Sequence, residues 1–69
     1  MSVHFAGTKK RYLLRIFKLQ PVTSSEYLDR LRVSYDLDQV IAAYNQLLDD
    51  HTIHRMEIVE ENQVILEDN

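Results

Sequence analysis

The clearest periodic signal in the chain lies between residues 37 and 49, where apolar side chains recur at steps of three and four residues. This spacing is typical of an amphipathic helix that buries one side. The preceding Asp36 is an N-cap acceptor, and Gln39 follows it by three residues, as in a capping box. We therefore predict a helix from Leu37 to about Asp49. Its predicted core stripe consists of Leu37, Val40, Ile41, Tyr44, Leu47 and Leu48.

A strand is predicted from Lys10 to Leu19, a segment rich in aromatic and branched side chains. It ends before Pro21, because proline cannot donate a hydrogen bond to a β-ladder. Alternation along the segment puts Tyr12, Leu14 and Ile16 on one face and Leu13, Phe17 and Leu19 on the other. Residues 1–9 show no periodicity and are predicted to form a tail.

The segment from Glu26 to Tyr35 fits two patterns, a strand or a helix capped by Thr23 and Glu26. We favour the strand, because a helix here would run into the better-capped one and leave the first strand without a neighbour.

A C-terminal hairpin is predicted after the helix. Its strands would be residues 52–59 and 63–67, which flank Glu60-Glu-Asn62, because asparagine tolerates the left-handed conformation of a tight turn.

These elements predict an α+β fold: a single domain over residues 10–69 with a four-stranded antiparallel sheet in β-β-α-β-β order and one helix on one face. One helix cannot cover both faces of such a sheet. The second face would therefore be an interface, unless some strand registers differ and its apolar residues lie at the helix edges or under the tail. The residues that alternation assigns to it are Leu13, Phe17, Leu19, Leu28, Ile53, Val59 and Ile65.

Composition narrows the class of protein. The chain has 69 residues with one glycine, one proline and no cysteine, which excludes disulfides and thiolate metal sites. No apolar run reaches the ~20 residues that a membrane span needs, and the N-terminus does not read as a signal peptide, so we expect a cytoplasmic protein without membrane contact. A domain this small buries little surface alone, which favours self-association.

Charge is divided unequally along the chain. Residues 1–32 hold seven basic and two acidic side chains, whereas residues 33–69 hold one basic and nine acidic side chains. One interpretation is a phosphate-binding patch on the first hairpin. The other is pairing between strands of one sheet, with Glu57 and Glu67 near the basic strands. A pI of about 5.4 favours the second interpretation. The patch would consist of Lys9, Lys10, Arg11, Arg15, Arg30 and Arg32.

Candidate chemistry is sparse. The one candidate metal site consists of His51 and His54 with Asp49 and Asp50 just before them. These residues fall at a junction between the helix and a strand, so they are better explained as a polar connection. Phosphate-binding loops, nucleophile elbows and His-Glu-x-x-His motifs are absent from the sequence. We therefore expect no enzyme activity, no bound metal and no cofactor.

The sequence thus favours a small protein-interaction domain, acting as an adaptor or a stoichiometric inhibitor of a protein partner and forming a homodimer. The alternative is a nucleic-acid-binding accessory protein that uses the basic hairpin. In the inhibitor version an acidic surface would occupy a basic groove of its partner. The residues expected to contact protein partners are Leu13, Phe17, Leu19, Asp49, Asp50, Glu57, Glu60 and Glu61.

Overall fold

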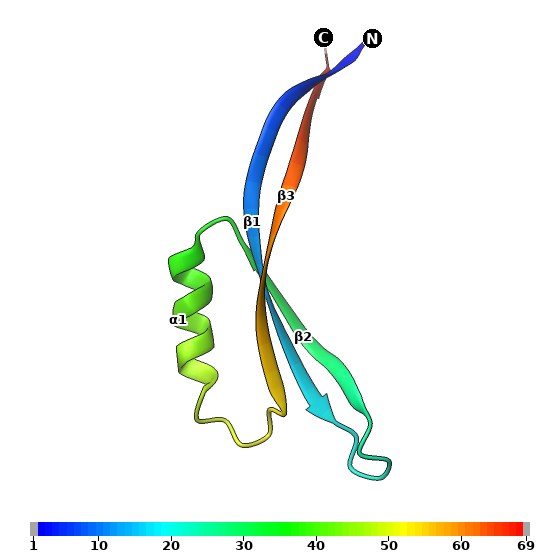
Figure 1. Cartoon of the computed structure of the whole chain (residues 1–69), viewed down its shortest axis with the longest axis vertical. Helices are drawn as coiled ribbons and strands as arrows, with labels where there is room; N and C mark the ends of the chain where they lie inside the picture. Colours follow the sequence, from blue (N-terminus) through cyan, green and yellow to red (C-terminus); the bar gives the residue numbers. More distant parts are fainter. Residues whose placement is uncertain (1, 69) are drawn as a thin grey trace.

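The computed structural model of the chain describes residues 2–68 and contains three strands and one helix (Figure 1). The elements are β1 (Val3–Leu19), β2 (Glu26–Ser34), α1 (Leu37–Leu47) and β3 (Arg55–Asp68). The strands form one antiparallel sheet in the order β2-β1-β3, so β1 is the central strand. Met1 and Asn69, the outer ends of the predicted tail and domain, lie outside the described residues.

The predicted four-stranded sheet is wrong, because the C-terminal hairpin does not form. Residues 60–62 continue β3 as an extended strand, and Asn62 pairs with Lys10 of β1 in the ladder. The segment predicted as a tail supplies the partner, since β1 begins at Val3 and pairs with β3 along nearly its whole length. Backbone groups that a turn would have satisfied locally are satisfied by this long-range pairing instead.

Gly7 permits the long first strand to bend. It has a φ of +125°, and the register between β1 and β3 shifts between Phe5 and Gly7. An extra residue in one strand is a β-bulge, and a glycine reaches a positive φ there without the steric cost that a side chain brings.

The start and the type of α1 agree with the sequence prediction. The Asp36 carboxylate accepts a hydrogen bond from the Asp38 backbone N–H at 2.9 Å, as an N-cap does. Gln39 does not close the predicted capping box. Its side-chain oxygen accepts a hydrogen bond from the Ser34 hydroxyl, and the Asp36 N–H donates to that same hydroxyl oxygen.

The core is small and lies between α1 and the centre of the sheet. Leu14 and Ile16 of β1 and Val40 of α1 are the buried apolar residues of the described chain. The helix packs over β1 and β2. Only part of the predicted helix stripe is therefore covered. Leu37, Ile41 and Leu48 are exposed, because they lie beside the part of the helix that contacts β1 and β2.

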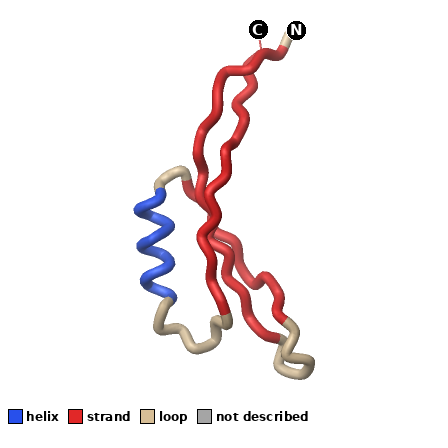
Figure 2. Tube along the Cα trace, in the orientation of Figure 1, coloured by secondary structure: helices blue, strands red, loops and turns tan. Residues whose placement is uncertain are grey.

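A two-stranded ribbon projects beyond the helix. The pairing between β1 and β2 ends at Tyr12 and Ser34, and past that point β1 and β3 continue alone toward both chain ends (Figure 2). We refer to residues 3–11 of β1 with residues 61–68 of β3 as the ribbon. The molecule is consequently elongated, with extents of 52 × 27 × 13 Å.

Within residues 2–68, α1 is far too short to cross a bilayer, and no membrane-spanning helix is present.

Candidate protein-binding surfaces

The sheet face opposite α1, here called the open face, has no element packed on it within the described chain. Its members follow from the ladder, because directly opposite residues of antiparallel strands share a face. It combines an apolar band with rows of charged residues. Its residues include Arg11, Leu13, Arg15, Phe17 and Leu19 of β1, Leu28, Leu31 and Val33 of β2, and Arg55, Glu57, Val59, Glu61 and Ile65 of β3.

An apolar row crosses the open face between two ion pairs. Leu13 lies directly opposite Val33 on one side and Val59 on the other. Arg11 pairs with Glu61 beyond one flank of the row. On the other flank Arg15 Nη1 lies 2.6 Å from Glu57 Oε1. Alternation along the sequence assigned six residues to this face correctly: Leu13, Phe17, Leu19, Leu28, Val59 and Ile65. Ile53, also assigned to it, packs instead against the core on the helix side.

An ion-pair network covers Phe17. The Arg55 guanidinium lies 4.2 Å from the centre of the Phe17 ring, a cation–π arrangement. Arg55 also donates two hydrogen bonds to Glu26, at 3.1 and 2.7 Å, and one to Glu57 at 2.9 Å. Phe17 is therefore less available to a partner than the apolar row around Leu13.

The same network shifts the ionisation of its members. Hydrogen bonding to Arg55 lowers the pKa of Glu26 below its usual value. Hydrogen bonding to Arg15, followed in effect by Arg55, lowers the pKa of Glu57. The pKa of the Arg55 guanidinium is raised, chiefly by its hydrogen bonds to Glu26. These carboxylates are therefore charged at neutral pH, and their cations are engaged within the chain.

Most of the candidate phosphate-binding cations are neutralised inside the molecule. Lys10 lies 2.9 Å from Glu60, and Arg30 lies 3.4 Å from Asp29. Lys9 sits over the Tyr35 ring at 4.3 Å. Within residues 2–68, Arg32 forms no ion pair. The pairs of Lys10, Arg11 and Arg15 join β1 to β3 and are cross-strand pairs of the kind that the second interpretation expects. Arg30 instead pairs with its sequence neighbour.

The candidate acidic residues do not form one surface. Glu57 and Glu61 lie on the open face with their arginine partners, whereas Glu60 lies on the helix side with Lys10. Asp49 and Asp50 follow the end of α1. The Asp50 carboxylate accepts hydrogen bonds from the side chain and the backbone N–H of Thr52, which lower its pKa. A single acidic docking surface of the predicted composition is therefore absent from the described chain.

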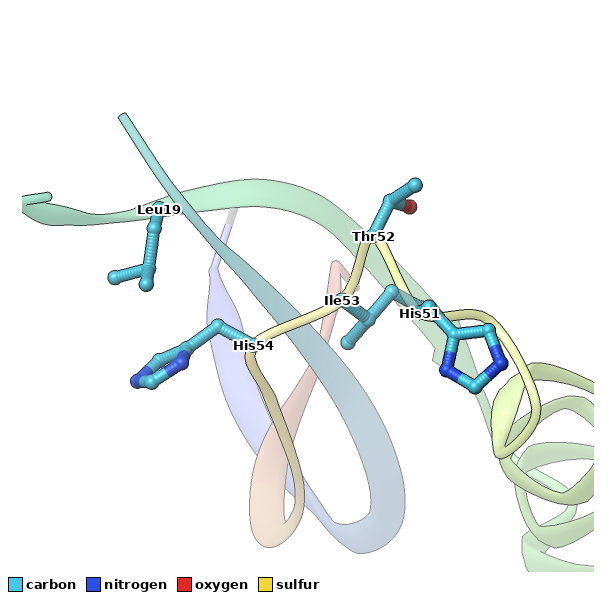
Figure 3. Close-up of a pocket in the computed structure, with 5 residues that line it drawn as sticks. All are labelled: Leu19, His51, Thr52, Ile53 and His54. Carbon is cyan, nitrogen blue, oxygen red and sulfur yellow. The ribbon is translucent and has the colours of Figure 1, made fainter. Parts of the chain in front are cut away.

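The connection between α1 and β3 forms a shallow hollow of about 300 Å³ next to Leu19, the last residue of β1 (Figure 3). His51 and His54 both line it, but their imidazoles lie on opposite sides of Ile53 in that view. Across residues 2–68, no cluster of three or more histidine or carboxylate side chains could hold a metal ion.

The ribbon carries an apolar surface that the sequence analysis did not recognise. Phe5 pairs with Leu66, and Val3 and Val64 lie two residues from them on the same strands, so the four side chains share one face. They are between 58 % and 64 % exposed. Alternation along β3 places Val64 and Leu66 on one face, but the pairing with residues 3–5 joins segments too far apart for local pattern to reveal. We call these four residues the ribbon patch.

Comparison with known proteins identifies no relative: no family model, no curated protein and no solved structure matches this chain.

Proposed function

We propose that this chain is a non-enzymatic protein-binding module, an adaptor or a stoichiometric inhibitor of a protein partner, that works as a homodimer joined through the ribbon patch. The observation that carries the proposal is the set of four apolar side chains on one face of the projecting ribbon: Val3, Phe5, Val64 and Leu66. Apolar groups gathered on one exposed face are the usual mark of a contact surface.

The ribbon needs a covering partner. Two-stranded ribbons are marginal in water unless an apolar face packs against another element. Here residues 3–11 and 61–68 are held together by strand pairing, with no turn between them in the described chain (Figure 1). Within the described chain α1 packs near the other end of the sheet, and the ribbon patch has no element on it. Ordering such a ribbon costs conformational entropy that its own side chains hardly offset.

A second copy of the chain would suit the ribbon patch, both in the area that it could bury and in the absence of charge. The chain exposes 5255 Å², whereas a compact monomer of 8.2 kDa would expose about 4500 Å². The excess, roughly 700 Å², is close to the ~800 Å² that each partner buries in a standard interface. The ribbon patch contains no charged residue, and the nearby His4 and Glu67 contact each other within the chain. Two such faces can therefore meet around a two-fold axis without like-charge repulsion.

Sedimentation equilibrium tests the proposal. At ~100 µM, above the micromolar dissociation constant expected for a contact of this size, the wild-type chain should sediment as a dimer. Phe5→Glu places a charge in the ribbon patch and should convert the dimer to a folded or partly frayed monomer of 8.2 kDa.

Two further variants make the result decisive. Val22→Glu introduces the same charge at a turn position that is 94 % exposed, and it should leave the dimer intact. Leu31→Glu charges the open face, where Leu31 is about half exposed. A monomeric wild-type chain, or a dimer that Leu31→Glu breaks and Phe5→Glu leaves intact, would overturn the assignment of the dimer contact to the ribbon patch.

A further inference from the structure

The helix carries two apolar stripes, and only one of them faces the sheet. At 100° per residue, Leu37, Ile41, Tyr44 and Leu48 lie within roughly 60° of one another around the helix axis. Their centre is turned by roughly 90° from that of Val40, Ala43 and Leu47, which pack toward the core. Leu37, Ile41 and Leu48 are 38 %, 40 % and 57 % exposed. Tyr44 is half-buried, because it also packs against the core. The other three side chains are apolar surface that no element of the described chain covers.

The exposed stripe is directed toward β3. On its other side the helix contacts β2, where Gln39 accepts a hydrogen bond from Ser34 and Ala43 lines a small hollow against that strand. The flank of the sheet below the stripe is also uncovered. Ile58 of β3 lies directly opposite Leu14, which is fully buried, yet Ile58 is 38 % exposed.

Together these residues form one apolar strip, which we call the lateral surface. Its exposed members are Leu37, Ile41 and Leu48 from the helix and its C-cap, and Ile58 from β3. Tyr44 and Met56 are half-buried members, because they also pack against the core.

The dimensions of the lateral surface suit a helix better than a strand. Neighbouring strands lie ~4.8 Å apart, and a helix with its side chains is ~10 Å wide, so α1 over β1 and β2 leaves room for one more helix over β3. A second helix 8–10 Å from the axis of α1 would contact both the exposed stripe and Ile58. A strand added to the outer edge of β3 would lie in the plane of the sheet and leave the stripe uncovered.

The charges around the lateral surface define the partner further. Between Tyr35 and His54 the chain has four aspartates and no lysine or arginine. Asp38 lies in the first turn of α1, and Asp49 lies just past its end. Within residues 2–68 neither forms an ion pair with a cation of this chain. A partner helix with basic residues beside its apolar stripe would supply these missing cations.

We infer that the lateral surface binds an amphipathic helix with basic flanks, contributed by a partner protein. The inference extends the proposed protein-binding role and names the class of partner. It does not depend on self-association, because the lateral surface and the ribbon patch share no residue.

A synthetic peptide is a direct probe. It would be a labelled 16-residue helix with leucines spaced i, i+4, i+7 and i+11 and lysines on both flanks, titrated with the full chain and followed by fluorescence anisotropy. Saturable micromolar binding is expected. A second peptide with glutamate in place of every lysine should bind at least tenfold more weakly.

Ile41→Glu separates specific docking from general charge attraction. The variant makes the protein more acidic, so a purely electrostatic association would strengthen. The proposal requires binding to weaken at least tenfold, because the apolar contact is lost. Ala42→Glu, which adds the same charge at an exposed position on another side of α1, should bind the lysine peptide as the wild type does.

Three results would overturn the inference: equal affinity for the two peptides, no binding of the lysine peptide, or unchanged affinity in Ile41→Glu. If Ile41→Glu instead lowers the sedimenting mass of the chain alone, the lateral surface is covered by a second copy and the inference is also wrong. The Phe5→Glu variant should bind the lysine peptide normally, so a failure of the proposed dimer contact can be told apart from a failure here.

Discussion

Val40 and Ile41 are neighbours in α1 with very different surroundings. Val40 is 3 % exposed and packs on Leu14 and Ile16, whereas Ile41 is 40 % exposed on the lateral surface. We expect Val40→Asp to cost on the order of 4 kcal/mol, because it buries an unpaired charge. That loss is close to the whole stability of a small domain, about 5 kcal/mol. Ile41→Asp should cost only about 1 kcal/mol, because its carboxylate can reach water.

Urea unfolding followed by circular dichroism measures both costs. We expect Val40→Asp to lose the cooperative unfolding transition and Ile41→Asp to retain it. The opposite order would mean that the helix is rotated about its axis relative to the structure. Periodicity alone placed both residues in one core stripe, because the sequence shows which positions are apolar and not how much of a helix the sheet can cover.

The Arg55 network predicts how stability responds to acid. The pKa values of Glu26 and Glu57 are lowered in the folded chain from an ordinary value of 4.5. A carboxylate with a lowered folded pKa contributes stability above its unfolded pKa, and this contribution is lost as the pH falls through the folded pKa. Stability should therefore decline below about pH 4.5 as the two carboxylates become protonated.

The variant Arg55→Met tests which cation acts on which carboxylate. The pKa of Glu26 should return toward 4.5, because its largest stabilising contact is the hydrogen bond to Arg55. The pKa of Glu57 should rise less, since Arg15 is its main partner. NMR titration of the side-chain carboxyl carbons reads both values. Equal shifts at the two glutamates, or none at Glu26, would contradict the network.

At the scale of elements, α1 was predictable because its signals are local. The Asp36 cap, the apolar steps and the start at Leu37 all lie within a few turns of chain. The strand assignment of residues 26–34 was also confirmed, and so was the face of β1 that carries Leu14 and Ile16. Which strands pair was not predictable in this way, because β-pairing joins residues far apart in the sequence.

The charge pattern did contain one long-range signal. Arg11 and Arg15 are four residues apart, and so are Glu57 and Glu61, which they meet in antiparallel order. Opposite charges with equal spacing on two predicted strands favour a register that places them side by side. The same register carries β3 straight through residues 60–62, where local turn preference had indicated a hairpin.

Asn62→Gly tests the continuous strand. In a tight turn glycine would stabilise the chain or leave it unchanged, because it accepts the left-handed conformation readily. In the middle of a strand it should destabilise by roughly 0.5–1 kcal/mol, because it loses more conformational entropy on folding. Asn62 pairs with Lys10 inside the ladder, so we expect destabilisation in urea unfolding. If Asn62→Gly instead stabilises the chain, residues 60–62 form a turn and the continuous strand is wrong.

At the scale of the whole molecule the main feature is an open, extended shape around a very small core. The radius of gyration is 16.5 Å, against about 11 Å for a compact domain of this length. The projecting ribbon accounts for this difference, because it extends beyond the helix (Figure 2). The apolar side chains of the ribbon patch are consequently exposed. This extended shape is explained if a second copy of the chain packs on the ribbon and buries the ribbon patch.

An isotope-filtered NOE experiment on a mixture of labelled and unlabelled chains detects only contacts between copies, so it shows where two chains meet. We predict NOEs from the Phe5 ring of one copy to the Val64 and Leu66 methyl groups of the other, because the proposed dimer brings the two ribbon patches face to face. Intermolecular NOEs confined to Leu31 and Val33, or none in a sample that sediments as a dimer, would contradict the account.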